Sequence, residues 1–197
     1  MKEKILSFSK PLLMFSVFAA LMLVQFSLSK VYPQKKLRGK KMEIKLYSNA
    51  FKEGELIPVK YTCQGANISP ELHWNNVPKD VKSFALIVED PDAPGGDFVH
   101  WIIYNIPGNT NELHEDITPS RNIPDEVMLG TNSFGKIGYG GPCPPSGKPH
   151  RYYFRIYALD TILHQMESGA TKQQLLKVME KHIIGEGFLM GKYQRGS

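Results

Sequence analysis

The sequence predicts a mainly β protein with a C-terminal helix, folded as one domain over about residues 42–197. The run Phe84–Val88 is apolar at every position, which is typical of a strand buried on both faces. The segment His150–Leu159 alternates with a period of two, as a half-buried strand does. Aromatic and β-branched residues are plentiful beside 17 Gly and 14 Pro, which favours a sheet-rich globular protein over a disordered one.

Residues 1–29 have the composition of a signal peptide or a membrane anchor. Lys2, Lys4 and Lys10 precede an apolar run over residues 11–28, and Ser27 and Ser29 supply small residues at the spacing that a signal peptidase requires. The run also approaches the about 20 residues that span a bilayer. We therefore expect an exported domain, periplasmic or extracellular, that is either cleaved or held at the membrane through residues 11–28.

A basic linker, residues 30–41, follows this leader and carries six Lys or Arg. Such a charged stretch favours the cytoplasmic side, so a tethered cytoplasmic domain is the alternative. Residues 1–41 hold nine basic residues and one acidic residue, a net charge of +8, whereas residues 42–197 hold fifteen and eighteen, a net charge of −3. Because the domain itself is mildly acidic, the overall charge of +5 does not indicate a nucleic-acid partner.

The first half of the domain consists of segments with strand patterns separated by turn residues. We predict strands at Met42–Tyr47, Leu56–Tyr61 and Leu72–Trp74. The buried run around residues 84–88 and the alternating segment Phe98–Tyr104 predict two central strands. The polar stretch 107–133 is rich in turn residues and predicts an irregular excursion before the strand that begins at His150.

The periodicity changes near the C-terminal end of the chain. Thr171 and Gln174, three residues apart, match a capping box at the start of a helix. Residues that recur at helical spacing follow, and we expect Gly185 and Gly187 to end the helix. The recurring positions are Leu175, Met179, His182 and Ile183.

Polar residues gather at strand ends beside turns rich in Gly and Pro. Asp90 lies where the buried strand ends, and prolines at positions 91 and 94 stiffen the loop around Asp92. Later in the chain, Gly138, Gly140 and Gly141 let the backbone approach a ligand and can point several N–H groups at an anion. Stiff polar loops at strand ends are typical positions for binding sites.

Strand alternation predicts where the two histidines near these loops point. In the segment Phe98–Tyr104, a period of two places His100 on the same face as Ile102. In the later strand, His150 and Tyr152 share a face. We therefore expect His150 and Tyr152 to reach one pocket together.

Three separated motifs stand out in this order: Asp90-Pro91-Asp92-Ala93-Pro94, His100-Trp101, and Gly138-Tyr139-Gly140-Gly141-Pro142-Cys143-Pro144-Pro145 followed by His150-Arg151-Tyr152. Together they resemble the phosphatidylethanolamine-binding protein family, in its bacterial Raf-kinase-inhibitor-like branch, over about residues 45–193. The resemblance implies a sandwich of two antiparallel sheets with a small pocket for phosphate-like head groups. Carried over by motif, the pocket uses Asp90, Asp92, His100, Gly141, Pro142, His150 and Tyr152. Cys143 departs from the eukaryotic members as an extra residue, so the prolines after it do not transfer.

The chemistry of these residue types suits a phosphate group. A protonated His donates from both ring nitrogens, and Asp90 would orient an imidazole and favour its protonation. We predict non-catalytic binding of a phosphate-like anion or phospholipid head group, without a cofactor or a resident metal. Regulation of a protein partner, a kinase or a protease, is implied by the resemblance alone.

Other interpretations of the same residues stay open. Each histidine taken alone is an ordinary strand residue, and Asp92 suits a turn. Asp90, His100 and His150 are alternatively the reactive residues of a hydrolase or a metal-dependent enzyme. The sequence has neither a Gly-x-Ser-x-Gly motif nor a Gly-Lys-Ser/Thr motif, which disfavours an enzyme.

The two cysteines, Cys63 and Cys143, each lie in a loop that carries one of the motifs. In an oxidising compartment they would pair and stiffen the site. As two small buried thiols they would have no such role.

Overall fold

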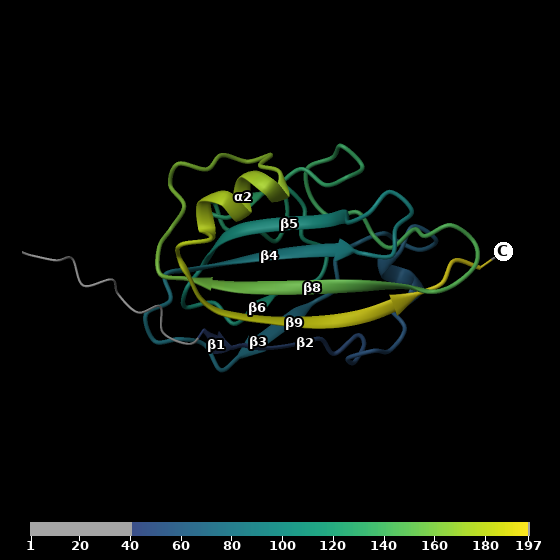
Figure 1. The fold of residues 1–197 in the computed structure, drawn as a ribbon, viewed down its shortest axis with the longest axis horizontal. Helices are drawn as coiled ribbons and strands as arrows, with labels where there is room; N and C mark the ends of the chain where they lie inside the picture. The colour runs from purple at the N-terminus through teal and green to yellow at the C-terminus, as the bar shows by residue number, and fades with distance from the viewer. Residues whose placement is uncertain (1–40, 197) are drawn as a thin grey trace, which may run out of the picture. The chain divides into compact units, whose positions relative to one another are not determined.

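We describe residues 41–196 of the chain from a computed structural model (Figure 1). The leader predicted at residues 1–29, and residues 30–40 of the linker, lie outside the described residues. In chain order the elements are β1 (Met42–Glu43), β2 (Lys45–Tyr47), η1 (Val59–Tyr61), β3 (Leu72–Asn75), β4 (Ser83–Asp90), β5 (Phe98–Pro107), β6 (Glu112–Leu113), β7 (Met128–Leu129), β8 (His150–Leu159), α2 (Lys172–Met179) and β9 (Ile183–Tyr193).

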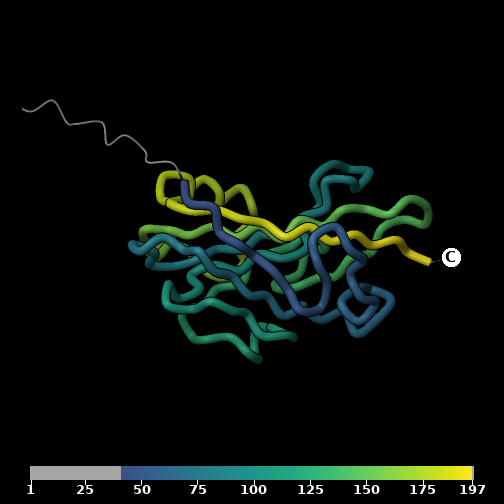
Figure 2. Tube along the Cα trace, turned by 90° about the horizontal axis from the view of Figure 1, so that it is seen from below, coloured from purple at the N-terminus to yellow at the C-terminus, as the bar shows by residue number. Residues whose placement is uncertain are grey.

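Within residues 41–196 the strands form two sheets, as the sequence predicted. The larger sheet has six strands in the order β1-β9-β8-β4-β5-β7, and the smaller has three in the order β2-β3-β6. Neighbouring described strands pair antiparallel, except that β1 runs parallel to β9. Figure 2 shows the segment that begins with β1 following the last strand of the chain. The predicted fold class, a sandwich with a helix, is confirmed.

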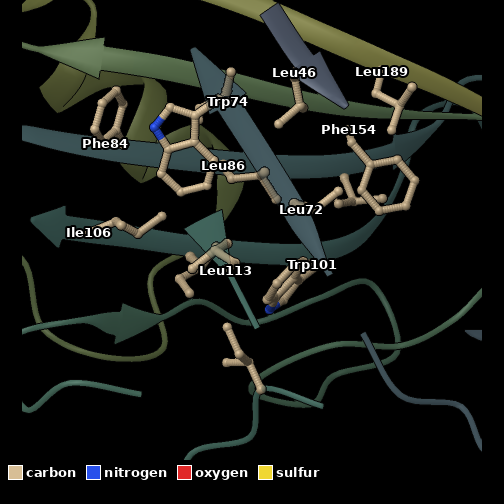
Figure 3. Close-up of a cluster of buried hydrophobic side chains, with 14 of the residues drawn as sticks. Leu46, Leu72, Trp74, Phe84, Leu86, Trp101, Ile106, Leu113, Phe154 and Leu189 are labelled. Carbon is tan, nitrogen blue, oxygen red and sulfur yellow. The ribbon is translucent and has the colours of Figure 1, made fainter. Parts of the chain in front are cut away.

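The main hydrophobic core lies between the two sheets (Figure 3). The small sheet contributes Trp74, which packs edge-on against Phe84 of β4 with ring centroids 5.2 Å apart. Trp101 of β5 and Phe154 of β8 extend the same cluster, and both are fully buried. Because aromatic rings bury large apolar areas, this cluster is what holds the sheets together.

A second cluster covers the opposite face of the large sheet. Ala85 and Ile87 of β4 pack there with Leu175 and Met179 of α2. All eight residues of β4 are therefore buried, which explains the unbroken apolar run in its sequence. The capping box predicted at Thr171 is present and starts α2.

The helix is shorter than the sequence predicted, and the prediction that Gly185 and Gly187 end it is wrong. Helix α2 ends at Met179, and the residues from Ile183 onward form β9, the last strand of the chain. Gly187 serves close packing of this strand, because a Cβ atom there would lie 2.0 Å from the Ile44 carbonyl oxygen. The helix is thus followed by a strand that completes the large sheet.

Two loop regions also differ in detail from the prediction. The strand expected at Leu56–Tyr61 is wrong: Leu56 forms an isolated bridge with Lys192, and Val59–Tyr61 is a short 3-10 helix. The expected irregular stretch 107–133 contains the two short strands β6 and β7. Both join sheets at an edge, where short strands suffice. Among the described residues, no helix has the length and apolar character needed to cross a membrane.

Candidate functional site

The centre of the candidate site is a pair formed by Asp90 and His150. Strands β4 and β8 are antiparallel neighbours, so the last residue of β4 meets the first residue of β8. The Asp90 carboxylate accepts a hydrogen bond from His150 Nδ1, with Oδ2 and Nδ1 2.8 Å apart. The side chains are 4% and 13% exposed, so water screens this pair little. The pair fixes a proton on Nδ1 and directs Nε2 away from Asp90.

Asp92 connects the loop after β4 to β8. Its backbone N–H donates to Asp90 Oδ1 at 2.8 Å, which is the turn geometry typical of Asp. Its carboxylate accepts two hydrogen bonds from the Arg151 guanidinium, at 2.9 and 2.6 Å, and one from the Arg151 backbone N–H at 2.9 Å. The Arg151 side chain lowers the pKa of Asp92 to about 2. Asp92 thus holds the loop in place, with its carboxylate already engaged.

His100 points to the site because of a β-bulge. Val88 pairs with Trp101 and Glu89 pairs with Val99, so His100 is an extra residue in β5. The alternation that placed His100 beside Ile102 is wrong for this reason. Ile102 belongs to the cluster under α2, whereas the His100 ring meets the Tyr152 ring edge-on, with centroids 5.2 Å apart.

The backbone of Gly140 fixes the protonation of His100. The imidazole is 3% exposed, and its Nδ1 lies 2.6 Å from the Gly140 carbonyl oxygen. Since a carbonyl oxygen only accepts, Nδ1 carries the hydrogen. Burial lowers the pKa of His100 below 6.5, against the opposing effects of the Gly140 carbonyl and the Asp90 charge. The lowered pKa favours the neutral form of His100, whereas the sequence analysis expected a protonated imidazole as anion donor.

We expect acid to destabilise the domain through His100. Because its pKa in the folded state lies below the ordinary value of 6.5, the unfolded chain binds this proton more readily. Stability is complete above the unfolded pKa and falls as the pH drops towards the folded pKa. Urea denaturation at a series of pH values would measure the free energy of unfolding. In the variant His100→Gln this free energy should fall less steeply as the pH is lowered. An unchanged pH dependence in that variant would contradict the assignment.

Tyr152 contributes a buried hydroxyl to the site. The residue is fully buried on the inward face of β8, and its hydroxyl has no hydrogen-bond partner among the described residues. Burial raises the pKa of Tyr152, and the nearby Asp90 carboxylate raises it further. The hydroxyl therefore keeps its proton at physiological pH and remains a donor.

Gly141 and Pro142 lie behind the site and join it to a second loop. The Gly141 N–H donates to Asn67 Oδ1 at 2.7 Å, and the Pro142 carbonyl accepts from the Cys63 N–H at 3.1 Å. A Cβ atom at Gly141 would lie 2.3 Å from the Tyr61 carbonyl oxygen. The close approach at this glycine is thus to protein backbone, and its N–H is already engaged.

A disulfide joins the same two loops. Cys63 and Cys143 are bonded, with Cα atoms 5.4 Å apart and 80 residues between them in sequence. The 139–143 segment also carries the Gly140 carbonyl, which accepts the hydrogen bond from His100 Nδ1. The disulfide therefore supports the wall of the site.

The structure brings Asp90, His100, His150 and Tyr152 together, places Asp92 at the rim and keeps Gly141 and Pro142 in the supporting layer. Within residues 41–196, no group of three His, Cys, Asp or Glu side chains has the arrangement of a metal site.

Sequence reasoning missed two residues beside the site, Asn67 and Phe134. Asn67 accepts a hydrogen bond from the Gly141 N–H, and Phe134 packs against the His100 ring. Gly140 was expected to approach a ligand, but its carbonyl accepts from His100 Nδ1 and its N–H donates to the His100 carbonyl. Asn67 lies in a turn with φ of 57°, where its side chain can reach across to another loop. No local pattern signals the role of Phe134, because it depends on the bulge at His100.

Comparisons with known proteins show what this chain is similar to. Residues 47–194 match the family model for phosphatidylethanolamine-binding protein. A UPF0098 protein of Methanothermobacter thermautotrophicus is 50% identical over 151 residues, covering 77% of this chain and 99% of that protein. A UPF0098 protein of Aquifex aeolicus is 42% identical over 153 residues, covering 77% of this chain and 89% of that protein.

Two solved structures are similar over the same region. CT736 of Chlamydia trachomatis, described as a phosphatidylethanolamine-binding protein homologue, superposes with a TM-score of 0.70 at 45% identity, covering 79% of this chain and 99% of that one. YbcL of E. coli, described as a member of the mammalian family, superposes with a TM-score of 0.73 at 33% identity, covering 80% and 100%. The chain belongs to the phosphatidylethanolamine-binding protein family.

Proposed function

We propose that this domain binds phosphate-bearing ligands, including phospholipid head groups, without catalysing a reaction. The ligand site is formed by His150 and Tyr152 as donors, with Asp90 and His100 as their supports. The observation that carries the proposal is the buried hydroxyl of Tyr152, which lies close to the Asp90 carboxylate of the Asp90–His150 pair.

The Tyr152 hydroxyl supports a ligand that accepts a hydrogen bond. A buried polar group without a partner costs about 1–3 kcal/mol. A phosphate oxygen that accepts from this hydroxyl would remove that cost in the bound state. Phosphate oxygens are strong acceptors, so the hydroxyl would discriminate in favour of a ligand of this type.

The Asp90–His150 pair supplies the charge that an anion requires. Asp90 holds one imidazole proton at Nδ1, so a second proton on Nε2 gives an imidazolium that donates towards the ligand. The carboxylate and the imidazolium compensate each other, which allows an acidic residue to lie close to an anion. In this proposal His150 is the residue that donates to the anion from Nε2.

His100 has a supporting role in this proposal. Its Nδ1 hydrogen is donated to Gly140, and its ring packs edge-on against Tyr152. The neutral imidazole thereby fixes the position of the phenol that carries the donor. His100 thus positions Tyr152, and His150 meets the ligand.

The variant Tyr152→Phe tests the proposal most directly because it removes a single oxygen. We expect about tenfold weaker binding of dimethyl phosphate by isothermal titration calorimetry, since one hydrogen bond to an anion is lost. The free energy of unfolding should change by no more than about 1 kcal/mol, because the buried hydroxyl makes no hydrogen bond of normal geometry to the protein. Equal affinity in the variant and the wild type would reject the proposed donor.

The variant His150→Ala tests the role of His150. We expect it to weaken the binding of dimethyl phosphate in the same titration, because it removes the imidazole that donates to the anion. His182→Ala is the matched control and should leave the affinity unchanged, because His182 pairs with Asp160 away from the site. Equal affinity in His150→Ala and the wild type would contradict the role of His150 as a donor.

We also propose that the domain is exported and works outside the cytoplasm. The Cys63–Cys143 disulfide supports this, because disulfides persist in oxidising compartments. Cell fractionation followed by thiol labelling under denaturing conditions would test it. The protein should be found outside the cytoplasm with both cysteines protected, and a cytoplasmic protein with reactive thiols would contradict the proposal.

A further inference from the structure

An exposed aromatic side chain packs against a residue of the site. Phe134 is 45% exposed, and its ring contacts the buried ring of His100, with centroids 5.5 Å apart. A large apolar side chain that is exposed on one side and contacts a polar site on the other can take part in ligand binding. The loop of Phe134 follows β7 and leads into the segment that carries Gly140.

The loop is built to hold Phe134 in this position. Asn132 is 4% exposed, and its Oδ1 accepts from the backbone N–H groups of Phe134 and Lys136 at 3.0 and 3.1 Å. Its Nδ2 donates to the Gly138 carbonyl at 2.9 Å. One buried amide thus fixes the loop at three points, so the exposed ring is part of an ordered turn.

The loop is also attached to the strand that carries His100. The Ser133 backbone N–H donates to the Val99 carbonyl at 2.8 Å, and the Val99 N–H donates to Ser133 Oγ at 2.9 Å. Both bonds are made by Val99, the residue before His100 at the bulge. The position of Phe134 is therefore coupled to that of His100.

The rings form a continuous series from solvent to the buried hydroxyl. Phe134 meets Phe98 edge-on with centroids 4.8 Å apart and meets His100 edge-on at 5.5 Å. His100 in turn contacts Tyr152 at 5.2 Å. A ligand whose phosphate reaches the Tyr152 hydroxyl would therefore place its substituent along Phe134 and Phe98.

We propose that Phe134 and Phe98 form an apolar subsite that selects the organic group of a phosphate ester, favouring an aromatic or acyl substituent over a small alkyl group. This inference rests on the proposed function of the same site. The inference concerns the organic substituent of the ester, which the residues that donate to the phosphate do not recognise. Phe134 is the specificity-determining residue, because its exposed ring gains contact only when such a substituent is present.

The experiment compares phenyl phosphate with methyl phosphate, which carry the same ionisable group. By isothermal titration calorimetry at one pH, the wild type should bind phenyl phosphate about tenfold more tightly. In Phe134→Ala the ratio of the two affinities should fall to about two or less, and Phe134→Leu should give an intermediate ratio. Ile162→Ala is the matched control, since Ile162 is 42% exposed but lies in the segment after β8, and it should leave the ratio unchanged.

The outcomes separate this inference from the proposed function. Binding of both esters with equal affinity in the wild type, or a preference that survives Phe134→Ala, would overturn the subsite and leave the anion site standing. Failure of both esters to bind would overturn the anion site and the subsite together. Thermal denaturation of each variant establishes that the change in ratio does not come from unfolding.

Discussion

Replacing Cys63 and Cys143 with serine should lower the free energy of unfolding by about 4 kcal/mol. The disulfide closes a loop of 80 residues, and a crosslink of this length removes much of the conformational freedom of the unfolded chain. Urea denaturation followed by tryptophan fluorescence would measure the loss, because Trp74 and Trp101 are both buried in the core.

Reduction of the wild type provides the matched control for this prediction. Dithiothreitol should bring the wild type to nearly the same stability as the Cys63→Ser/Cys143→Ser variant, and the reductant should leave the variant unchanged. A wild type whose unfolding midpoint does not move on full reduction would show that the crosslink contributes little.

Replacing Gly141 with alanine should destabilise the domain by about 3 kcal/mol. The new Cβ atom would lie 2.3 Å from the Tyr61 carbonyl oxygen and 2.9 Å from Thr62 Cα, which are both backbone atoms that cannot rotate away. The two loops must then separate, and the hydrogen bond from Gly141 to Asn67 is lost with them. Chemical denaturation measures the effect.

Gly95→Ala is the control for this substitution. A Cβ atom at Gly95 meets nothing within 4 Å, so its effect should stay within about 0.5 kcal/mol. Equal stability of Gly141→Ala and the wild type would mean that the two loops separate without cost. The ligand affinity of Gly141→Ala should also fall, because Gly140 is the adjacent residue and fixes His100.

The sequence predicted those parts of the site that depend on strand order and motif. Asp90 closes an apolar strand and His150 opens an alternating one, so their meeting followed once the two strands became neighbours. The face shared by His150 and Tyr152 followed from a regular strand, because β8 pairs with β4 without interruption up to Glu89. The capping box of α2 could also be predicted, because it involves only residues that are close together in the sequence.

The remaining features depend on contacts that no local pattern encodes. His100 changes face because β5 contains one residue more than its partner at that point. Ile183 continues the helical spacing of the preceding segment, yet residues 183–193 form a strand because β1 and β8 offer one partner on each side. The Gly141 N–H was expected to face a ligand. It instead donates a hydrogen bond to the side chain of Asn67, which lies in a loop 74 residues away in sequence.

Strand order has a consequence for synthesis of the protein. β4 and β5 are consecutive in the chain and can pair early, but the other edge of β4 waits for β8, whose His150 is made 60 residues after Asp90. At a typical rate of 5–20 residues per second, β4, with its apolar run Phe84–Val88, keeps one open edge for roughly 3–12 s on the ribosome. During that interval the β4–β5 hairpin of the nascent chain exposes an unpaired strand edge, which can pair with another chain. Binding of a chaperone at this stage would protect the chain from aggregation.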